Sequence, residues 1–592
     1  MHGGKTPPCT FPSNLAPKGD KPMKKILTFL LLAALLLTSC GQTLVDEGKS
    51  TETETAPQTT ELITDTDTEA ATFDTETEVP ETEEETPLRI SDPQLVTALR
   101  KAIDKEEGSL YLSDFEGITS LYFSFQNFSD LSVLASLPDL TRLTLSGCSI
   151  SNVNSLARLT DLTSLKLSGR SSAAFISVLT DMENLTSLTI DNCPITDPSP
   201  LTRMANLTSL SLDADSVSDM SFLVEMTNLT ELALSGRLIT DVSFLENLTN
   251  LTSLSLNLCS ITDFSPLASL TNLTNLDLLN SNISNLSPLS NLTNLTNLDL
   301  TRNQISDIAP LAGLTKLTTL SLSEDSQIKD ISPLSNLTDL TYLRLGYCDK
   351  ISDFSPLSNL INLEHLELND NNISDISFLA NLTALKELQL NQNNISDISA
   401  LANLTDLQQL LLSNNDVSDI TAIASLTNLT ELNLSYNYVS DISPLAAMTK
   451  MEIMDLETNG FSDISPLANL TKLTELRLSY NRISDISALS DLTDVRYLYL
   501  KKNKISDVSP LADLTNLKYL DLSMNKISDI SSLENLTKLT DLYFDYNEVR
   551  DISVLRNLRD LIEVHFDWEL VADRRPIDHV AENRRKSGRP IS

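Results

Sequence analysis

Side chains that carry catalytic chemistry are scarce in this sequence. Histidine occurs four times in 592 residues, and His365 and His565, the two within the central part of the chain, lie far apart. No Ser/His/Asp or Cys/His set can be assembled around either of them, and no glycine-rich phosphate loop is present. We therefore predict a protein that is not an enzyme and binds no cofactor. A degenerate enzyme or enzyme subunit is the least favoured alternative.

Cysteine and basic residues are also few. Zinc sites need paired ligands at short spacing, and the central cysteines each stand alone in the sequence. We expect buried free thiols rather than metal ligands or disulfides. These residues are Cys148, Cys193, Cys259 and Cys348. Lys and Arg number 42 against 81 Asp and Glu, a formal net charge of −39. Such a charge repels phosphates and excludes nucleic acid as a partner.

What the sequence does contain is one unit repeated many times. A clean copy, Leu295 to Lys316, reads LTNLDLTRNQISDIAPLAGLTK. Leu298 and Leu300 are two residues apart, the period of a strand, whereas the apolar residues from Ile305 onward are three apart, the period of a 3₁₀ helix. A short strand with one such return cannot bury its own apolar face, so each unit must stack on its neighbours.

The strand leucine of this unit recurs from Leu121 to Val564. It marks twenty-one turns, 22 residues apart except for three steps of 23, and a fixed period of this size indicates a solenoid. The pattern LxxLxLxxN resembles the leucine-rich repeat. The return, as in Ile395 to Leu407, resembles that of the short repeats in internalin-type bacterial surface proteins. The resemblance implies an α/β repeat solenoid, an arc with a parallel β-sheet on its concave face, 3₁₀-like convex returns and an N-terminal helical cap.

The start of the chain predicts secretion. Lys24 and Lys25 precede an apolar run, 26–37, which is too short to span a bilayer, and Thr38, Ser39 and Cys40 follow. Cys40 at the cut resembles the bacterial lipobox, which implies a lipid on its thiol; an ordinary secretory cut near Ser39 is the alternative. Met23 is the expected true start. Many internalin-type proteins carry further domains after the repeats, and none follows here, so the lipid is the expected membrane anchor.

Composition divides the rest of the chain. Residues 41–87 hold fifteen acids against one base and few large apolar side chains, so we expect a disordered linker that acts as a stalk or a passive spacer. Asp92 and Pro93 begin a predicted helix whose apolar face covers the first turn. The predicted domains are 1–40 leader, 41–87 linker, 88–117 N-terminal cap, 118–570 repeats, and 571–592 C-terminal cap and basic tail.

The ninth position of each unit is predicted to point inward. Asn303 and its equivalents can satisfy backbone groups of the turn with both ends of a carboxamide, and the four cysteines occupy the same position in other units. Arg170 and Arg237 also fall there. A buried unpaired guanidinium is costly, so we expect both to swing outward.

The third, fifth and seventh positions are predicted to face the inner surface, with the eighth at its rim. In the first half these positions are mostly small and polar, but in the last third they become aromatic. The predicted binding residues are Tyr436, Tyr480, Tyr497, Tyr499, Lys502, Tyr519, Tyr543, Tyr546 and Trp568. Strands lie ~4.8 Å apart, so we expect one contiguous patch. Clustered exposed aromatic residues mark contact sites, although tyrosine also simply suits strand surfaces.

We therefore predict a monomeric, lipid-anchored binding protein at the bacterial cell surface. Its inner face would mediate protein recognition or adhesion. The alternative is a glycan-binding lipoprotein whose aromatic residues stack on sugar rings, which makes a polysaccharide the second candidate partner.

Overall fold

The computed structural model describes residues 85–169, 176–193, 195, 197–213, 217 and 219–587. The chain divides into two units, Met1–Thr82 and Glu83–Ser592, and everything below concerns the second. The predicted leader, Cys40, Arg170 and nearly all of the acidic linker lie outside the described residues.

Most of the second unit is one parallel sheet of 21 strands that follow one another in sequence order. Its strands are β1 (Ser120–Ser124), β3 (Arg142–Ser146), β5 (Ser164–Ser168), β6 (Ser187–Asp191), β7 (Ser209–Asp213), β8 (Glu231–Ser235), β9 (Ser253–Asn257), β10 (Asn275–Asp277), β11 (Asn297–Asp299), β12 (Thr319–Ser321), β13 (Tyr342–Arg344), β14 (His365–Glu367), β15 (Glu387–Gln389), β16 (Gln409–Leu411), β17 (Glu431–Asn433), β18 (Ile453–Asp455), β19 (Glu475–Arg477), β20 (Tyr497–Tyr499), β21 (Tyr519–Asp521), β22 (Asp541–Tyr543) and β23 (Glu563–His565). A second pair, β2 (Asn127–Phe128) with β4 (Ser149–Ile150), is also parallel.

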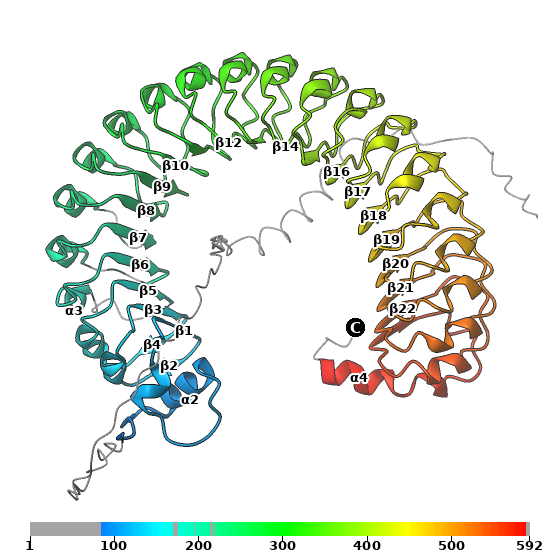
Figure 1. Ribbon diagram of the computed structural model, residues 1–592, viewed down its shortest axis with the longest axis horizontal. Coiled ribbons are helices and arrows are strands. Elements are labelled where there is room, and N and C mark those ends of the chain that lie inside the picture. Colours follow the sequence, from blue (N-terminus) through cyan, green and yellow to red (C-terminus); the bar gives the residue numbers. More distant parts are fainter. Residues whose placement is uncertain are drawn as a thin grey trace, which may run out of the picture. The chain divides into compact units, whose positions relative to one another are not determined.

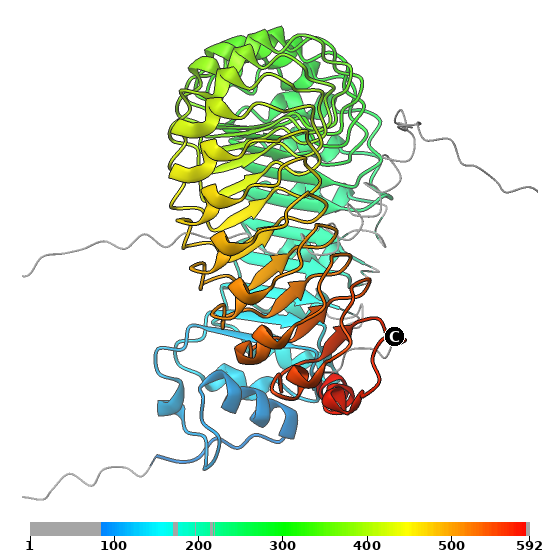
Figure 2. The same ribbon diagram turned by 90° about the vertical axis from the view of Figure 1, so that its right-hand side faces the viewer.

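The strands line the inner side of the repeats and short 3₁₀ turns line the outer side (Figure 1). One such turn, Ala309–Gly313, follows β11, as the threefold spacing after Ile305 predicts. Each strand is in register with its neighbours: Leu298 pairs with Leu276 and with Leu320. The fold predicted from the repeat, a solenoid with a parallel sheet and 3₁₀ returns, is confirmed. Figure 2 shows the common direction of the strands from the side.

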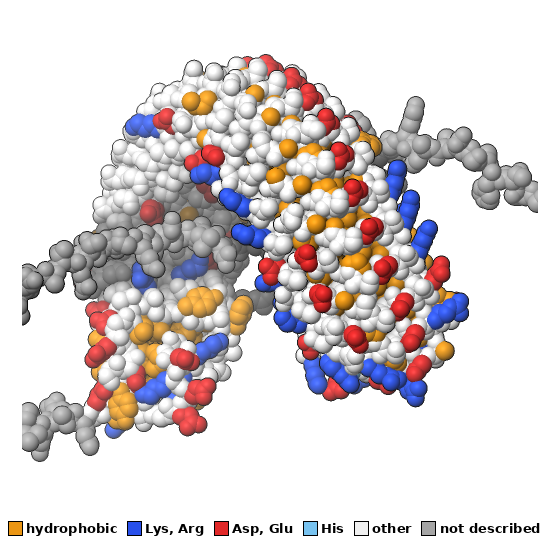
Figure 3. All heavy atoms as spheres, turned by 45° about the vertical axis from the view of Figure 1, so that its right-hand side comes forward, with side chains coloured by type: hydrophobic (Ala, Val, Ile, Leu, Met, Phe, Trp, Pro, Cys, Tyr) orange, Lys and Arg blue, Asp and Glu red, His pale blue; other side chains and the backbone are white. Residues whose placement is uncertain are grey.

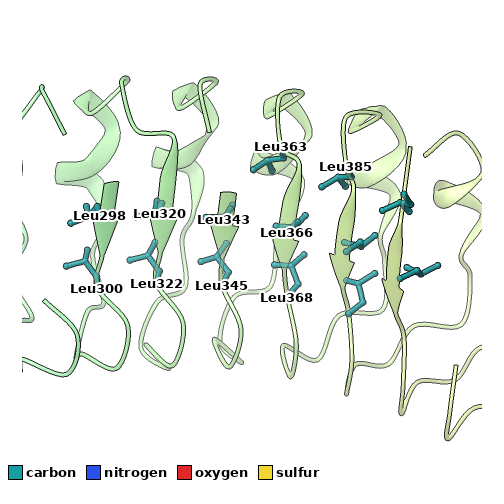
Figure 4. Packing of buried hydrophobic residues seen from close by; sticks show 14 of the residues in the cluster. Leu298, Leu300, Leu320, Leu322, Leu343, Leu345, Leu363, Leu366, Leu368 and Leu385 are labelled. Atoms are coloured by element: carbon teal, nitrogen blue, oxygen red, sulfur yellow. The ribbon is translucent and has the colours of Figure 1, made fainter. Parts of the chain in front are cut away.

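The core is a set of leucine columns between the sheet and the turns. Leu298, Leu320 and Leu343 form one column and Leu300 and Leu322 belong to the next (Figure 4). All five are essentially inaccessible to solvent. Because identical side chains meet in adjacent units, the core is continuous from one end of the array to the other.

The asparagine ladder at the ninth position runs inside the turns, as predicted. Asn437 donates from Nδ2 to the carbonyls of Leu412 (2.9 Å) and Leu434 (3.1 Å), and its Oδ1 accepts from the amide of Val417 (3.0 Å). The four cysteines are free and buried. Cys348 Sγ lies 3.3 Å from the Leu322 carbonyl, and burial raises the pKa of this thiol to about 12. Arg237 is exposed, as expected.

Two further ladders follow the outside of the turns. Thr296 Oγ1 donates to the Thr274 carbonyl of the preceding unit (3.1 Å), and Asn294 Nδ2 donates to the Thr271 carbonyl (3.0 Å). The Asp of each Ser-Asp-Ile accepts from the amide two residues on, as Asp307 does from Ala309 (2.9 Å). Acidic side chains therefore recur at regular intervals along the repeats (Figure 3).

Helices lie at both ends of the sheet. Helix α2 (Pro93–Ala102) begins at Asp92, as predicted, and buries Leu95 and Leu99 completely. Helix α4 (Val580–Ser587) packs beside β23, and Asn583 Nδ2 donates to the Leu561 carbonyl (2.9 Å). Sequence patterns predicted only a cap and a basic tail there. A four-residue helix, α3 (Ile176–Leu179), replaces one 3₁₀ turn. Among the described residues, none of the helices has the length and apolar character needed to cross a bilayer.

Candidate binding surface

The C-terminal strands carry a continuous stack of side chains on the inner face. The ring centroids of Tyr499 and Tyr519 lie 4.6 Å apart, and those of Tyr519 and Tyr543 lie 5.3 Å apart. His565 stacks on Tyr543 at 4.9 Å, and the guanidinium of Arg477 lies 4.7 Å from the Tyr499 ring at the other end. The stack, named here the tyrosine stack, therefore crosses five consecutive strands from β19 to β23.

Local geometry explains why the stack is unbroken. Tyr499, Asp521 and Tyr543 occupy the fifth position of three neighbouring units and are in register. Asp521 is too short to stack, and it is buried. The ring of Tyr519, from the third position of the same strand as Asp521, lies between the other two rings. The three stacked tyrosines are half-buried rather than free on the surface.

Arg477 and His565 are not among the binding residues predicted from the sequence. Both occupy the fifth position, so the repeat register itself could have placed them in line with Tyr499 and Tyr543. Each is held by an acid: Arg477 bonds Glu475 at 2.6 Å, and His565 Nε2 lies 3.0 Å from Glu563.

The remaining predicted residues lie around the stack rather than in it. Tyr497 is in register with Tyr519 and is 39 % exposed. Lys502 Nζ lies 4.9 Å from the ring of Tyr480. Trp568 packs on Phe566 at 4.5 Å. The guanidinium of Arg574 lies 5.2 Å from the Trp568 ring.

Tyr436 and Tyr546 stand at the rim, 54 % and 70 % exposed. They share a left-handed backbone with Tyr480 and Lys502, and φ of these four residues lies between 55° and 58°. This conformation is uncommon for large side chains and turns each of them outward from the end of its strand.

Burial favours the neutral form of the phenols of Tyr499 and Tyr519. Burial raises the pKa of Tyr519, and the nearby carboxylate of Asp521 raises it further. Burial also raises the pKa of Tyr499, although Arg477 opposes the change. The hydroxyls therefore remain protonated at neutral pH and can donate hydrogen bonds to a partner.

A second, smaller cluster lies in the middle of the sheet. Tyr342 and His365 stack at 4.2 Å with an interplanar angle of 7°, and His365 Nδ1 lies 2.6 Å from Glu387. On the same strands Arg344 bonds Glu367 at 2.6 Å. Within the part of the chain that the structure describes, no group of three His, Cys, Asp or Glu side chains could hold a metal ion.

Comparison with known proteins identifies the family. The model for "Leucine Rich repeats (2 copies)" matches eight overlapping or adjacent segments that together cover more than half of the chain. The chain belongs to the leucine-rich repeat family. The matched segments are 227–269, 271–313, 315–359, 361–403, 405–447, 427–469, 471–513 and 515–557. No curated protein matches the sequence.

Several solved leucine-rich repeat structures are similar. An internalin (inlF) of Listeria monocytogenes is 25 % identical over 80 % of this chain and 94 % of its own, with a TM-score of 0.32. A leucine-rich repeat protein of Leptospira interrogans is 23 % identical over 75 % of this chain and 99 % of its own, with a TM-score of 0.43. The Arabidopsis receptor kinase HAESA, in complex with the peptide hormone IDA and the co-receptor SERK1, is 24 % identical over 76 % and 78 %, with a TM-score of 0.51.

Proposed function

We propose that this leucine-rich repeat protein is a lipid-anchored binding protein of the bacterial cell surface. It recognises a protein partner through the C-terminal third of its inner face. The observation that carries the proposal is the tyrosine stack, a surface of aromatic edges and neutral hydroxyls across five strands. A few such aromatic anchors usually dominate the affinity of a protein interface.

The stacking geometry favours a protein over a glycan at this site. A sugar ring needs the open face of an aromatic side chain. Tyr499, Tyr519 and Tyr543 each already have a neighbouring side chain on both sides along the sheet, at centroid distances of 4.6 to 5.3 Å. What these rings offer outward is their edges and hydroxyls, which suit backbone and side-chain acceptors of a polypeptide.

The fold is compatible with this role. HAESA, which shares it, was solved in complex with a peptide hormone. Repeat arrays present a long continuous surface on their strands, and such surfaces serve as binding scaffolds.

Glycan binding remains the second candidate because other rings are open. Tyr436 and Tyr546 project from the rim, and Trp568 is about half exposed beside the exposed guanidinium of Arg574. These rings are separate from the tyrosine stack, so substitutions can distinguish the two candidates.

The test compares three variants of the full chain against surface proteins in a pull-down and against a glycan array. Changing Tyr499, Tyr519 and Tyr543 together to Phe keeps the rings stacked and removes the hydroxyls. We expect this variant to unfold like the wild type and to lose most of its protein binding. Changing Tyr436 and Tyr546 to Ser should leave protein binding in place.

The matched control changes Ser211 and Ser253, which lie on the inner face of β7 and β9, to Tyr. It should leave affinity unchanged. Protein binding that survives the triple Phe change but fails in this control would move the site to the first half of the array. A glycan signal that disappears with Tyr436 and Tyr546 would establish the second candidate instead.

A further inference from the structure

The opposite end of the inner face carries a second aromatic group. Phe125 is 84 % exposed and Tyr122 is 64 % exposed, and both belong to the first unit of the array. Tyr122 occupies the fifth position on β1, and Phe125 occupies the eighth. The inner face of this half is predicted to be mostly small and polar, and Tyr122 and Phe125 are exceptions to that prediction.

Phe125 is held in place on the surface. Its backbone is left-handed, with φ of 53°, and its amide donates to the Ser146 carbonyl at 2.8 Å. Its ring lies against Gly147, where an added Cβ would come within 2.8 Å of Phe125 Cδ1. Gly169, in the next unit, in turn approaches Gly147 so closely that a Cβ would lie 2.9 Å from the Gly147 Cα. The ring therefore lies beside the backbone of Gly147 and is open to solvent.

The charge beside these rings is opposite to that of the protein. Arg142 on β3 is in register with Ser120 on β1. Lys166 lies on β5, two strands from Tyr122, and occupies the same position of its unit as Tyr122 does. Lys166 pairs with Asp191 at 3.0 Å, whereas Arg142 is exposed and has no ion pair among the described residues. Arg142 thus presents an exposed cation on the strand next to Tyr122, at the end of β3 opposite to the one that Phe125 contacts.

We propose that Tyr122, Phe125, Arg142 and Lys166 form a second docking surface, which takes an acidic segment of a protein partner with an apolar anchor residue. The anchor packs on the ring of Phe125, and a carboxylate of the segment pairs with Arg142. The surface is separate from the tyrosine stack and does not depend on what that stack binds.

A polypeptide fits this surface better than a lipid bilayer does. A single unpaired arginine attracts an anionic membrane weakly, and the many acids of the chain oppose that attraction. Two aromatic rings alone cover too little area for a stable complex, so the occupant must extend along the neighbouring strands. Their small side chains, such as Ser164 and Ser187 on β5 and β6, leave room for an extended segment.

The test selects binders from a random-sequence peptide library displayed against the full chain. We expect the enriched peptides to combine Asp or Glu with an aromatic or aliphatic residue. Phe125→Asn should weaken the binding of these peptides roughly thirtyfold, because aromatic anchors dominate interfaces. Asparagine tolerates the left-handed backbone, so this variant should fold like the wild type. Arg142→Glu should weaken the same peptides about tenfold or more.

The matched control is Leu258→Asn. Leu258 occupies the same turn position with φ of 59° and is also exposed, but it lies four strands beyond Lys166. This change should leave peptide affinity unchanged, and thermal unfolding should show that all three variants are folded.

Several outcomes would overturn the proposal. They are the absence of enriched peptides, enriched peptides without acids, and enriched peptides that bind Phe125→Asn as well as the wild type. Peptides that instead lose affinity for the variant with Tyr499, Tyr519 and Tyr543 changed to Phe would belong to the tyrosine stack. Sedimentation with phosphatidylglycerol vesicles that is lost in Phe125→Asn would assign the surface to a lipid membrane, also against the proposal.

Discussion

Asp325 stands at the ninth position of its unit, where most units have the asparagine of the internal ladder, and it places a carboxyl group there. It is completely buried, and its Oδ1 accepts from the amide of Ile305 at 3.1 Å. Its Oδ2 is also buried and has no hydrogen-bond partner among the described residues. In the preceding unit the equivalent atom, Asn303 Nδ2, donates to the Leu278 carbonyl at 2.8 Å. Only a protonated carboxyl can donate in the same way.

A pH dependence of stability follows from this position. Burial raises the pKa of Asp325 to about 7, and the charges of Asp299 and Glu324 add to the effect. In the unfolded chain the pKa is about 3.9, so the folded state binds the proton more tightly. The folded protein is therefore favoured below about pH 4, and this contribution is lost progressively as the pH rises toward 7.

Asp325→Asn should remove this dependence. We expect the variant to be more stable than the wild type by roughly 2–4 kcal/mol at pH 8 and about equal to it at pH 4. Urea unfolding at the two pH values measures the difference. A variant that is less stable at pH 8 would show that the carboxyl is ionised and satisfied in the folded state.

The regular ladder residues can be tested at Asn437. Asn437→Ala should destabilise the protein by roughly 1–3 kcal/mol, because it leaves the buried Val417 amide without an acceptor and removes one of the two donors to each of the Leu412 and Leu434 carbonyls. Asn437→Cys should cost less, since Cys348 Sγ reaches a carbonyl from the same position. Equal unfolding midpoints for the wild type and the alanine variant would contradict the ladder's role.

At the scale of the strand and turn, the sequence predicts whatever recurs in every unit. The leucine columns and the asparagine ladder could be assigned because one residue type repeats at one position. The left-handed turn residue could not, because Arg302, Glu324, Tyr436 and Met524 all adopt it with nothing in common. The left-handed conformation at this position is set by hydrogen bonds to the backbone of the neighbouring unit. The amide of Arg302, for example, donates to the Ser323 carbonyl at 2.9 Å.

The candidate site shows the same division. Inner-face positions follow from the strand period, so the tyrosines of the last third could be named from the sequence. The strand period predicts which face of the sheet a side chain lies on, but it does not predict the direction in which the side chain then extends. The position of the Tyr519 ring between those of Tyr499 and Tyr543 depends on that direction. Their half-buried state depends on the same direction, so it could not be predicted from the strand period either.

That packing predicts unequal effects of two neighbouring substitutions. Tyr519→Ser should lower stability by roughly 1–3 kcal/mol, since it removes two ring contacts. Tyr497→Ser, at the third position of the preceding strand, should change stability by less than about 0.5 kcal/mol. Chemical denaturation of both variants tests this, and equal losses would mean that the stack contributes nothing beyond exposed surface.

At the scale of the whole molecule, the anchor decides where the array acts. Cys40 is the proposed acceptor of lipid at the cut site. Cys40→Ala should therefore release the protein into the medium or leave it uncleaved, because no other thiol lies at that site. Fractionation of the bacterial cells with detection of the repeat domain measures the outcome. A variant that loses its leader and still remains with the membranes would refute lipid anchoring.

The common register of all the strands has a consequence for how such a chain changes over generations. Leu276, Leu298 and Leu320 pair in the same way, so deleting one whole unit would join two surfaces that already match. Recombination that deletes or adds one whole unit would keep the reading frame and give a folded product. The number of units is therefore a heritable variable that can change in one step. Each step would move the two aromatic ends of the inner face closer or farther along the sheet by one strand spacing, about 4.8 Å.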